Sequence, residues 1–212
     1  YYCADDGMTW YFTIRDDAKF TDGEPLSASD VAFTINGIIE SEAAEADLSM
    51  VEKAVATDDT HVEITMTKPY NALLYTLAVV GIVPEHAHGE DYGANPIGSG
   101  RYMLEQWDRG QQVILKANPD YYGEAPKMER VVVVFMEEDA ALAAVRAGQV
   151  DIAYTSATYS DQTSEGYELF ACETVDSRGI SLPSIAAGQT KADGANEYPA
   201  GNDVTCDLTV RR

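Results

Sequence analysis

The stretch that decides the fold spans residues 95–154 and reads NPIGSGRYMLEQWDRGQQVILKANPDYYGEAPKMERVVVVFMEEDAALAAVRAGQVDIAY. Its first half holds two β-prone runs, at 102–107 and 112–117, separated by a short polar loop that contains Gly110. This pattern predicts a β-hairpin. Asn118 and Pro119 end the second run, because proline lacks the N–H group that a β-ladder needs.

The second half of the stretch predicts a βαβ unit. Residues 131–135 read VVVVF, an apolar run typical of a strand buried on both faces. Acidic residues at 137–139 favour a first helical turn, the alanine-rich run 140–147 favours the helix itself, and Gly148 stands where a cap would end it. Residues 149–154 then return as a strand. We therefore expect a right-handed crossover and a parallel pair of strands.

The chain before this stretch mixes strands and helices. Residues 10–15 alternate between apolar and polar, which predicts a half-buried strand. Ser27 and Asp30 have a spacing related to the capping box, and helix-spaced apolar residues follow them. The runs 51–56 and 61–67 predict a second hairpin. The sequence thus indicates a mixed α/β (α+β) protein.

Pro69 suits the first turn of a second helix, whose apolar face is rich in leucine. Beyond residue 154 the periodicity weakens. A segment near 181–203, rich in Gly, Ala, Asn and Pro, is predicted to be poorly ordered because no packing pattern holds it.

Composition limits the classes of partner. The 212 residues are 45% apolar, which is ordinary for a globular protein, and 14 basic against 36 acidic side chains give a net charge of −22. Such a charge repels nucleic acid and anionic lipid, so we expect no nucleic-acid partner. Scattered surface carboxylates usually serve solubility and do not by themselves indicate a metal site.

One cluster has metal-ligand residue types close together. Residues 85–91 read EHAHGED, and on a strand His86 and His88 would point the same way, as zinc or nickel ligands can. Pro84 and Gly89 instead indicate a turn or helix start, where side chains two apart diverge. We interpret the segment as a solvated loop. The alternatives are a metal site or an acid- or metal-dependent hydrolase built on it.

Other patterns of catalysis are absent from the sequence. It has no G-x-S-x-G motif, and the glycine-rich run 93–100 has no G-K-[ST] after it, so we expect neither an enzyme nor a cofactor. Cys3, Cys172 and Cys206 show no C-x-x-C spacing. Cys172 and Cys206 could form a disulfide in an exported protein, and free thiols are an equally open alternative.

The chain resembles the family 5 extracellular solute-binding proteins, the peptide and nickel receptors of ABC importers. That family has a run like PIGTGPYxLxxWxxG, then NPDYWGxxPxLDxI, a strand, and a helix ending in LxAGxxDI. An earlier family run, DGxTxTFxLRxxxKFxDGxPLxAxDV, resembles residues 6–31, and Arg101 departs from the pattern where the family has proline. The residues matching the later runs are Pro96, Gly98, Gly100, Tyr102, Leu104, Trp107, Gly110, Asn118, Pro119, Tyr121, Tyr122, Gly123, Pro126, Ala147, Gly148, Asp151 and Ile152.

The resemblance implies a periplasmic-binding-protein-like fold of class II. Residues 1–95 would form a small lobe, and 96–212 would form part of a larger, discontinuous lobe. The family runs imply further chain on both sides, so we expect an incomplete fold: an internal fragment, less than half of a receptor, that lacks most of the ligand site. Exposed strand edges in such a fragment predict self-association.

The resemblance also implies a function. The receptor would capture oligopeptides or dipeptides outside the cytoplasmic membrane, in the periplasm or anchored at the cell surface, and deliver them to an ABC permease. A nickel or metal-chelate receptor is the alternative within the family, but its branch has an arginine near the position of Gly81, where this chain has none. The candidate ligand-lining residues are Gly81, Tyr154 and Thr155, the last two because ligands usually bind where strands of an α/β sheet end.

Overall fold

The computed structural model describes residues 1–41, 46–162 and 165–172. The chain divides into two compact units, Tyr1–Tyr154 and Thr155–Arg212, and the first holds almost all of the regular structure described below. No helix among the described residues has the length and apolar character needed to cross a membrane.

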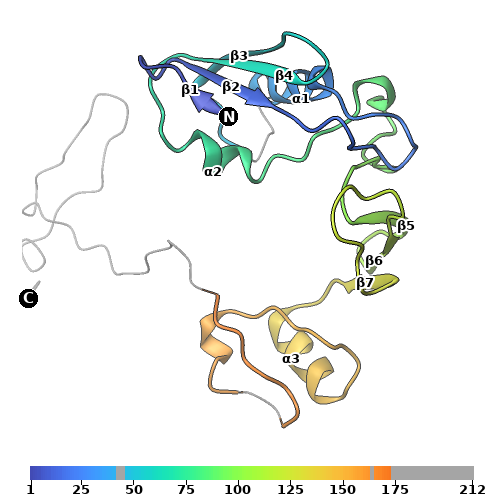
Figure 1. Ribbon diagram of the computed structural model, residues 1–212. Helices are drawn as coiled ribbons and strands as arrows, with labels where there is room; N and C mark the ends of the chain where they lie inside the picture. Colours follow the sequence, from blue (N-terminus) through green and yellow to red (C-terminus); the bar gives the residue numbers. More distant parts are fainter. Residues whose placement is uncertain (42–45, 163–164, 173–212) are drawn as a thin grey trace, which may run out of the picture. The chain divides into compact units, whose positions relative to one another are not determined.

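A four-stranded antiparallel sheet forms the start of the chain (Figure 1). Its strands are β1 (Tyr2–Cys3), β2 (Thr9–Thr13), β3 (Val51–Ala56) and β4 (His61–Met66), in the order β1-β2-β4-β3. The predicted strand near 10–15 and the predicted hairpin at 51–67 are both confirmed.

Helix α1 (Ala28–Glu40) packs on this sheet and buries its apolar side. Trp10 pairs with Ile64 across β2 and β4, so both side chains lie on the face that α1 covers. Burying such side chains contributes roughly 1.5 to 3 kcal/mol each. The buried cluster consists of Trp10, Ala28, Ala32, Ile35, Leu48, Val51, Ala54, Val62, Ile64, Met66 and Leu73.

The predicted capping box is confirmed at the start of α1. The carboxylate of Asp30 accepts hydrogen bonds from the backbone N–H of Ser27 at 2.9 Å and from its hydroxyl at 2.8 Å. The second helix, α2 (Leu73–Leu77), begins four positions after Pro69, so the prediction of Pro69 in its first turn is wrong. The next element is a single 3₁₀ turn, η1 (Glu85–Ala87).

A second antiparallel sheet has three strands, β5 (Tyr102–Asp108), β6 (Gln112–Ala117) and β7 (Arg130–Val134), in that order. The predicted hairpin is β5 and β6. A register shift between Leu104 and Gln106 inserts one extra residue into β5. Because side chains alternate along a strand, this bulge moves Trp107 onto the face that carries Leu104.

The predicted βαβ unit is wrong. Helix α3 (Glu138–Arg146) follows β7, and Gly148 ends it with φ +66°, as the sequence predicts. However, β7 pairs antiparallel with β6, and residues 149–154 form no strand. Val132 and Val134 are 47% and 43% exposed, so β7 is not buried on both faces. An apolar run fixes strand propensity but not the presence of a neighbour that would bury it.

An arginine joins the two sheets. The Arg15 guanidinium, just after β2, lies 4.2 Å from the ring centre of Tyr122 and donates a hydrogen bond to the Tyr122 carbonyl at 3.2 Å. The ring centroids of Tyr121 and Tyr122 are 4.5 Å apart, and Arg101 lies 5.3 Å from the Tyr121 ring. These charge–ring contacts stabilise the loop that follows β6.

The predicted lobes, 1–95 and 96–212, correspond to no boundary between the compact units and stay a prediction. The segment 181–203 lies outside the described residues. In the second unit the described part contains one 3₁₀ turn, η2 (Ala157–Tyr159).

Candidate ligand-binding site

Residues 79–85, here called the anchored segment, connect α2 to η1 and contain the predicted site residue Gly81. Asp30 fixes one end of the segment. This side chain is buried. Its Oδ1 accepts a hydrogen bond from the backbone N–H of Glu85 at 2.9 Å, and its Oδ2 accepts one from the backbone N–H of Ser27. A buried carboxylate needs several such donors, so Asp30 holds both the start of α1 and the end of the segment.

Thr34, one turn further along α1, fixes the middle of the segment. Its Oγ1 accepts the backbone N–H of Val83 at 3.0 Å and donates to the Asp30 carbonyl at 2.8 Å. Thr34 and Asp30 are both 5% exposed, and each side chain accepts a hydrogen bond from a backbone amide of the anchored segment. The two buried polar side chains of α1 therefore set the position of the anchored segment against the helix.

Gly81 and Ile82 form the part of the segment that α1 does not hold. Gly81 is exposed, and no atom of the described residues lies within 4 Å of the place that a Cβ would take. Within the described chain, no group forms a hydrogen bond with the backbone of either residue. Their peptide groups are therefore open to an extended ligand, which can pair with them as a strand does.

Two large side chains that shortly precede Gly81 in the sequence are also open to solvent. Tyr75 is 83% exposed on α2, and Val79, four positions later, is 77% exposed. The sequence pattern did not indicate either residue, because the leucines of the helix predict only its buried side. Tyr75 lies off that stripe, and an aromatic residue on the polar side of a helix is the signal that could have found it.

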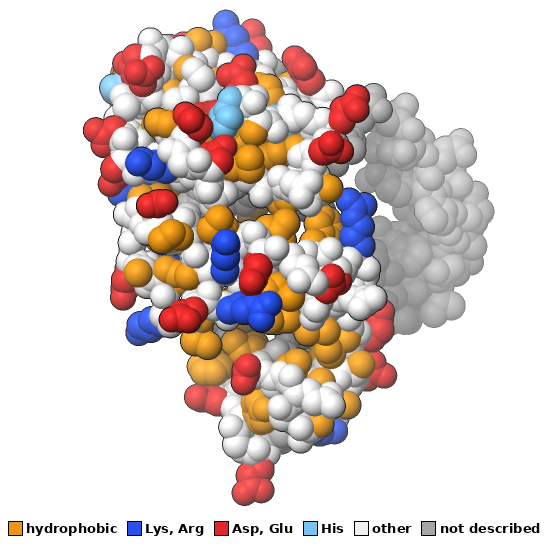
Figure 2. Space-filling model, turned by 90° about the vertical axis from the view of Figure 1, so that its right-hand side faces the viewer, with side chains coloured by type: hydrophobic (Ala, Val, Ile, Leu, Met, Phe, Trp, Pro, Cys, Tyr) orange, Lys and Arg blue, Asp and Glu red, His pale blue; other side chains and the backbone are white. Residues whose placement is uncertain are grey.

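His86 and His88 diverge, as the turn prediction expects. His86 Nε2 lies 2.8 Å from Asp22 Oδ2, whereas the His88 ring lies against Phe33 and Tyr92 at centroid distances of 5.3 and 5.0 Å. The described residues contain no group of three or more His, Cys, Asp or Glu side chains placed to hold a metal ion. Figure 2 shows acidic side chains spread over the face it draws.

The hydrogen bond between Asp22 and His86 shifts the pKa of both side chains. The hydrogen bond to Asp22 raises the pKa of His86, more than burial lowers it. Burial alone would raise the pKa of Asp22, but the hydrogen bonds from His86 and from the Glu24 amide outweigh it and lower that pKa. His86 is therefore engaged in a local ion pair with Asp22.

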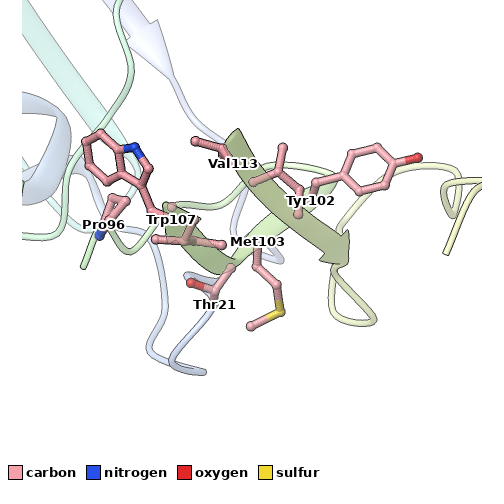
Figure 3. Close-up of a pocket in the computed structure, with 9 residues that line it drawn as sticks. Thr21, Pro96, Tyr102, Met103, Trp107 and Val113 are labelled. Carbon is pink, nitrogen blue, oxygen red and sulfur yellow. The ribbon is translucent and has the colours of Figure 1, made fainter. Parts of the chain in front are cut away.

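An open apolar hollow of about 310 Å³ lies between the β5–β6 hairpin and two loops (Figure 3). Trp107, which the bulge turns to this side, lies beside Pro96 in the close-up. The Thr21 amide donates to the Gly98 carbonyl at 2.8 Å and closes one wall. The hollow can accept an apolar side chain. Its lining residues are Thr21, Pro96, Gly98, Tyr102, Met103, Leu104, Trp107, Val113 and Leu115.

The other predicted site residues lie apart from regular structure. Tyr154 is 87% exposed, and Thr155, in the other compact unit, is half-buried. The strand that led to their selection is not formed, so their role stays a prediction. Cys172 is exposed, and Cys206 lies outside the described residues, so their disulfide also stays a prediction.

Comparison with known proteins decides the family. The profile of the bacterial extracellular solute-binding proteins, family 5 middle region, matches residues 1–181. The chain belongs to this family. The family 5 chain is 33% identical to Protein XP55 of Streptomyces lividans over 206 residues, which are 91% of this chain and 37% of that protein. It is 34% identical to the probable D,D-dipeptide-binding periplasmic protein DdpA of Escherichia coli K12 over 162 residues, 71% of this chain and 31% of that protein.

Solved structures agree with the assignment and confirm a periplasmic-binding-protein-like fold. NikZ of Campylobacter jejuni with Ni(L-His) is 28% identical with a TM-score of 0.63, and covers 70% of this chain and 32% of its own. AppA of Bacillus subtilis with a nonapeptide is 26% identical with a TM-score of 0.64, and covers 76% of this chain and 35% of its own.

The family 5 chain spans about a third of the length of these relatives, 31–37% of the two curated proteins above. Family membership makes it part of an extracellular solute-binding protein, and the relatives that carry a functional name are named as binding proteins. The names of its relatives and neighbours include binders of peptides, nickel and opines.

Proposed function

We propose that the protein carrying this chain captures short peptides outside the cytoplasmic membrane and delivers them to an ABC permease. Two comparisons support peptides as the ligand class: the Escherichia coli relative is named for D,D-dipeptides, and the Bacillus subtilis structure holds a nonapeptide. The receptor would hold the peptide backbone by strand-like hydrogen bonds and accept varied side chains around it.

The observation that carries this proposal is the open backbone of Gly81 and Ile82. Their peptide groups have no hydrogen-bond partner among the described residues, yet Val83 and Glu85 beside them are fixed on α1. Preorganised donors and acceptors lower the conformational-entropy cost of binding a ligand. Tyr75 and Val79 would contact ligand side chains next to this edge. Tyr154 and Thr155 remain proposed ligand-lining residues of the same receptor.

A metal chelate is the second candidate. It is favoured by the nickel-binding periplasmic protein of Escherichia coli, 29% identical over 162 residues, and by the Ni(L-His) complex of the Campylobacter jejuni structure. Two observations argue against a chelate. Residues 79–83, directly before Pro84, are all uncharged, and the His86 side chain is hydrogen-bonded to Asp22. A chelate held by charge would need a cationic or ligating side chain in this place.

Substitution at Gly81 tests the proposal. In the protein that carries this sequence, Gly81→Val would crowd the open peptide groups, and no described atom lies within 4 Å of the new Cβ. We expect peptide affinity to fall by about tenfold or more, the equivalent of about 1.4 kcal/mol. Gly89→Val is the matched control, since its surroundings are equally open. Unchanged peptide affinity in Gly81→Val, or titration by Ni(L-His) but by no peptide, would refute the peptide site.

A further inference from the structure

Asn36 on α1 makes a two-point contact with the edge of the first sheet. Its Nδ2 donates a hydrogen bond to the Ala54 carbonyl at 2.8 Å, and its Oδ1 accepts one from the Ala54 amide at 2.9 Å. Ala54 lies opposite Ile64 of β4, and its backbone groups point away from β4 because these directions alternate along an antiparallel strand. The side chain of Asn36 therefore pairs with β3 as a residue of a further strand would.

This amide fixes α1 in a way that apolar packing does not. The helix buries Ala28, Ala32 and Ile35 in the core cluster, and such burial has no preferred direction. A planar amide, in contrast, satisfies its donor and its acceptor on one backbone residue only at one rotation of the helix and one height along its axis. The half-buried side chain of Asn36 therefore sets the position of α1 on the sheet.

The anchored segment is held on another side of the same helix. Thr34 and Asn36 are two positions apart, so they lie about 200° apart around a helix of 3.6 residues per turn. Thr34 accepts a hydrogen bond from the Val83 amide, and Asp30, about one turn before it, accepts one from the Glu85 amide. Helix α1 thus connects the edge of β3 on one side to the backbone of the anchored segment on the other.

We propose that Asn36 is a positioning residue for ligand binding: by fixing α1 on β3, it sets the place at which the anchored segment presents Gly81 and Ile82 to a peptide. This inference rests on the proposed function. Asn36 acts through Thr34 and Asp30. A helix free to slide or turn would carry the hydroxyl and the carboxylate of these two residues with it, and ordering the segment again on binding would reduce affinity.

Asn36→Leu removes both hydrogen bonds at nearly constant side-chain size. In the protein that carries this sequence, at a temperature where circular dichroism shows every variant folded, we expect affinity for the best-binding member of a mixed dipeptide library to fall by about threefold or more. The Val83 and Glu85 amides should exchange faster by about tenfold or more. Ile35→Val trims the neighbouring core side chain without removing a hydrogen bond, so it is the matched control and should change neither.

Asn36→Asp gives a result that a general loss of stability would not produce. The ionised carboxylate still accepts from the Ala54 amide, but it places an oxygen against the Ala54 carbonyl, so affinity near neutral pH should fall. Protonation restores a donor, so the ratio of variant to wild-type affinity should recover as pH falls toward about 4, the range in which an aspartate titrates. This variant keeps one of the two hydrogen bonds and carries the test if Asn36→Leu does not fold.

Three results would overturn the role of Asn36. They are unchanged exchange of the Val83 and Glu85 amides in Asn36→Leu, faster exchange with unchanged affinity, and an Asn36→Asp affinity ratio that does not depend on pH. A wild-type protein that binds no peptide would instead refute the proposed function. Amide exchange alone then decides whether Asn36 positions the anchored segment.

Discussion

The Oδ1 atom of Asp30 accepts the backbone N–H of Glu85 at 2.9 Å, across 55 positions of the chain. The same carboxylate caps the start of α1 through Ser27. The start of a helix and the end of the anchored segment therefore depend on one buried group. Any ligand that pairs with Gly81 meets a backbone whose position this group sets.

Asp30→Asn should destabilise the protein by about 2–3 kcal/mol, because the amide can accept at only one of the two positions and leaves a buried donor unpaired. Thermal or denaturant unfolding measures the change. Hydrogen exchange should also become faster at the Glu85 amide. Asp16→Asn, at an exposed position, is the control and should stay within about 0.5 kcal/mol of the wild type. Equal stability of the two variants would contradict the role of Asp30.

Thr34→Val should cost about 1–3 kcal/mol, since the partly buried Val83 amide loses its hydrogen-bond partner. Thr34→Ser keeps the hydroxyl and should recover most of this loss. Denaturant unfolding of the three proteins compares them. If the serine variant is as unstable as the valine variant, packing of the threonine methyl rather than the hydrogen bond holds the segment.

The ion pair between His86 and Asp22 predicts a pH dependence. The raised pKa of His86 means that its contribution to stability is fully present below its ordinary pKa of 6.5 and is lost as pH rises through the folded-state value. The lowered pKa of Asp22 means that its contribution is present above 3.8 and is lost as pH falls through its folded-state value. The pair therefore stabilises the protein most between these two ordinary values.

In the wild type, the melting temperature should fall as pH rises from 6.5 through the folded-state pKa of His86. His86→Gln should abolish this fall. His88→Gln, whose ring contacts Phe33 and Tyr92 without such an ion pair, is the matched control and should keep the wild-type pH profile. A profile of His86→Gln that follows the wild type would show that the pair contributes nothing.

Gly123→Ala tests the aromatic loop that joins the two sheets. A Cβ at this position would lie 2.6 Å from Tyr121 Cε1, so the Tyr121 ring must shift, and its contact with the Tyr122 ring must change. We expect a loss of about 1–3 kcal/mol, as for other overpacked sites, together with a weaker near-ultraviolet circular dichroism signal from the tyrosines. Gly89→Ala adds its methyl group in open space and should change neither. An unchanged tyrosine signal in Gly123→Ala would argue against a fixed ring pair.

Local patterns predicted the elements well where all the partners are near in sequence. The spacing of Ser27 and Asp30 predicted the start of α1, and the two hairpins have short loops that fix their pairing. The contact between Asp30 and Glu85 could not be predicted, because nothing in the local sequence shows that a capping carboxylate has a free oxygen for a distant amide.

The predicted crossover after β7 failed for a related reason. The run 131–135 and the alanine-rich helix after it are common in parallel βαβ units, but a parallel strand also requires a neighbouring strand to accept it. In the described part of the chain, β7 has β6 alone as a neighbour. Gly81 was selected from the resemblance, whereas its open backbone and the exposed Tyr75 emerged only from the structure.

We propose that the protein carrying this sequence binds short peptides. Native mass spectrometry of that protein, purified from its own host without added ligand, tests it most directly. We expect gentle activation to release peptides of a few residues. Release of a metal chelate or an opine instead, or an empty protein that binds no member of a mixed peptide library, would contradict it.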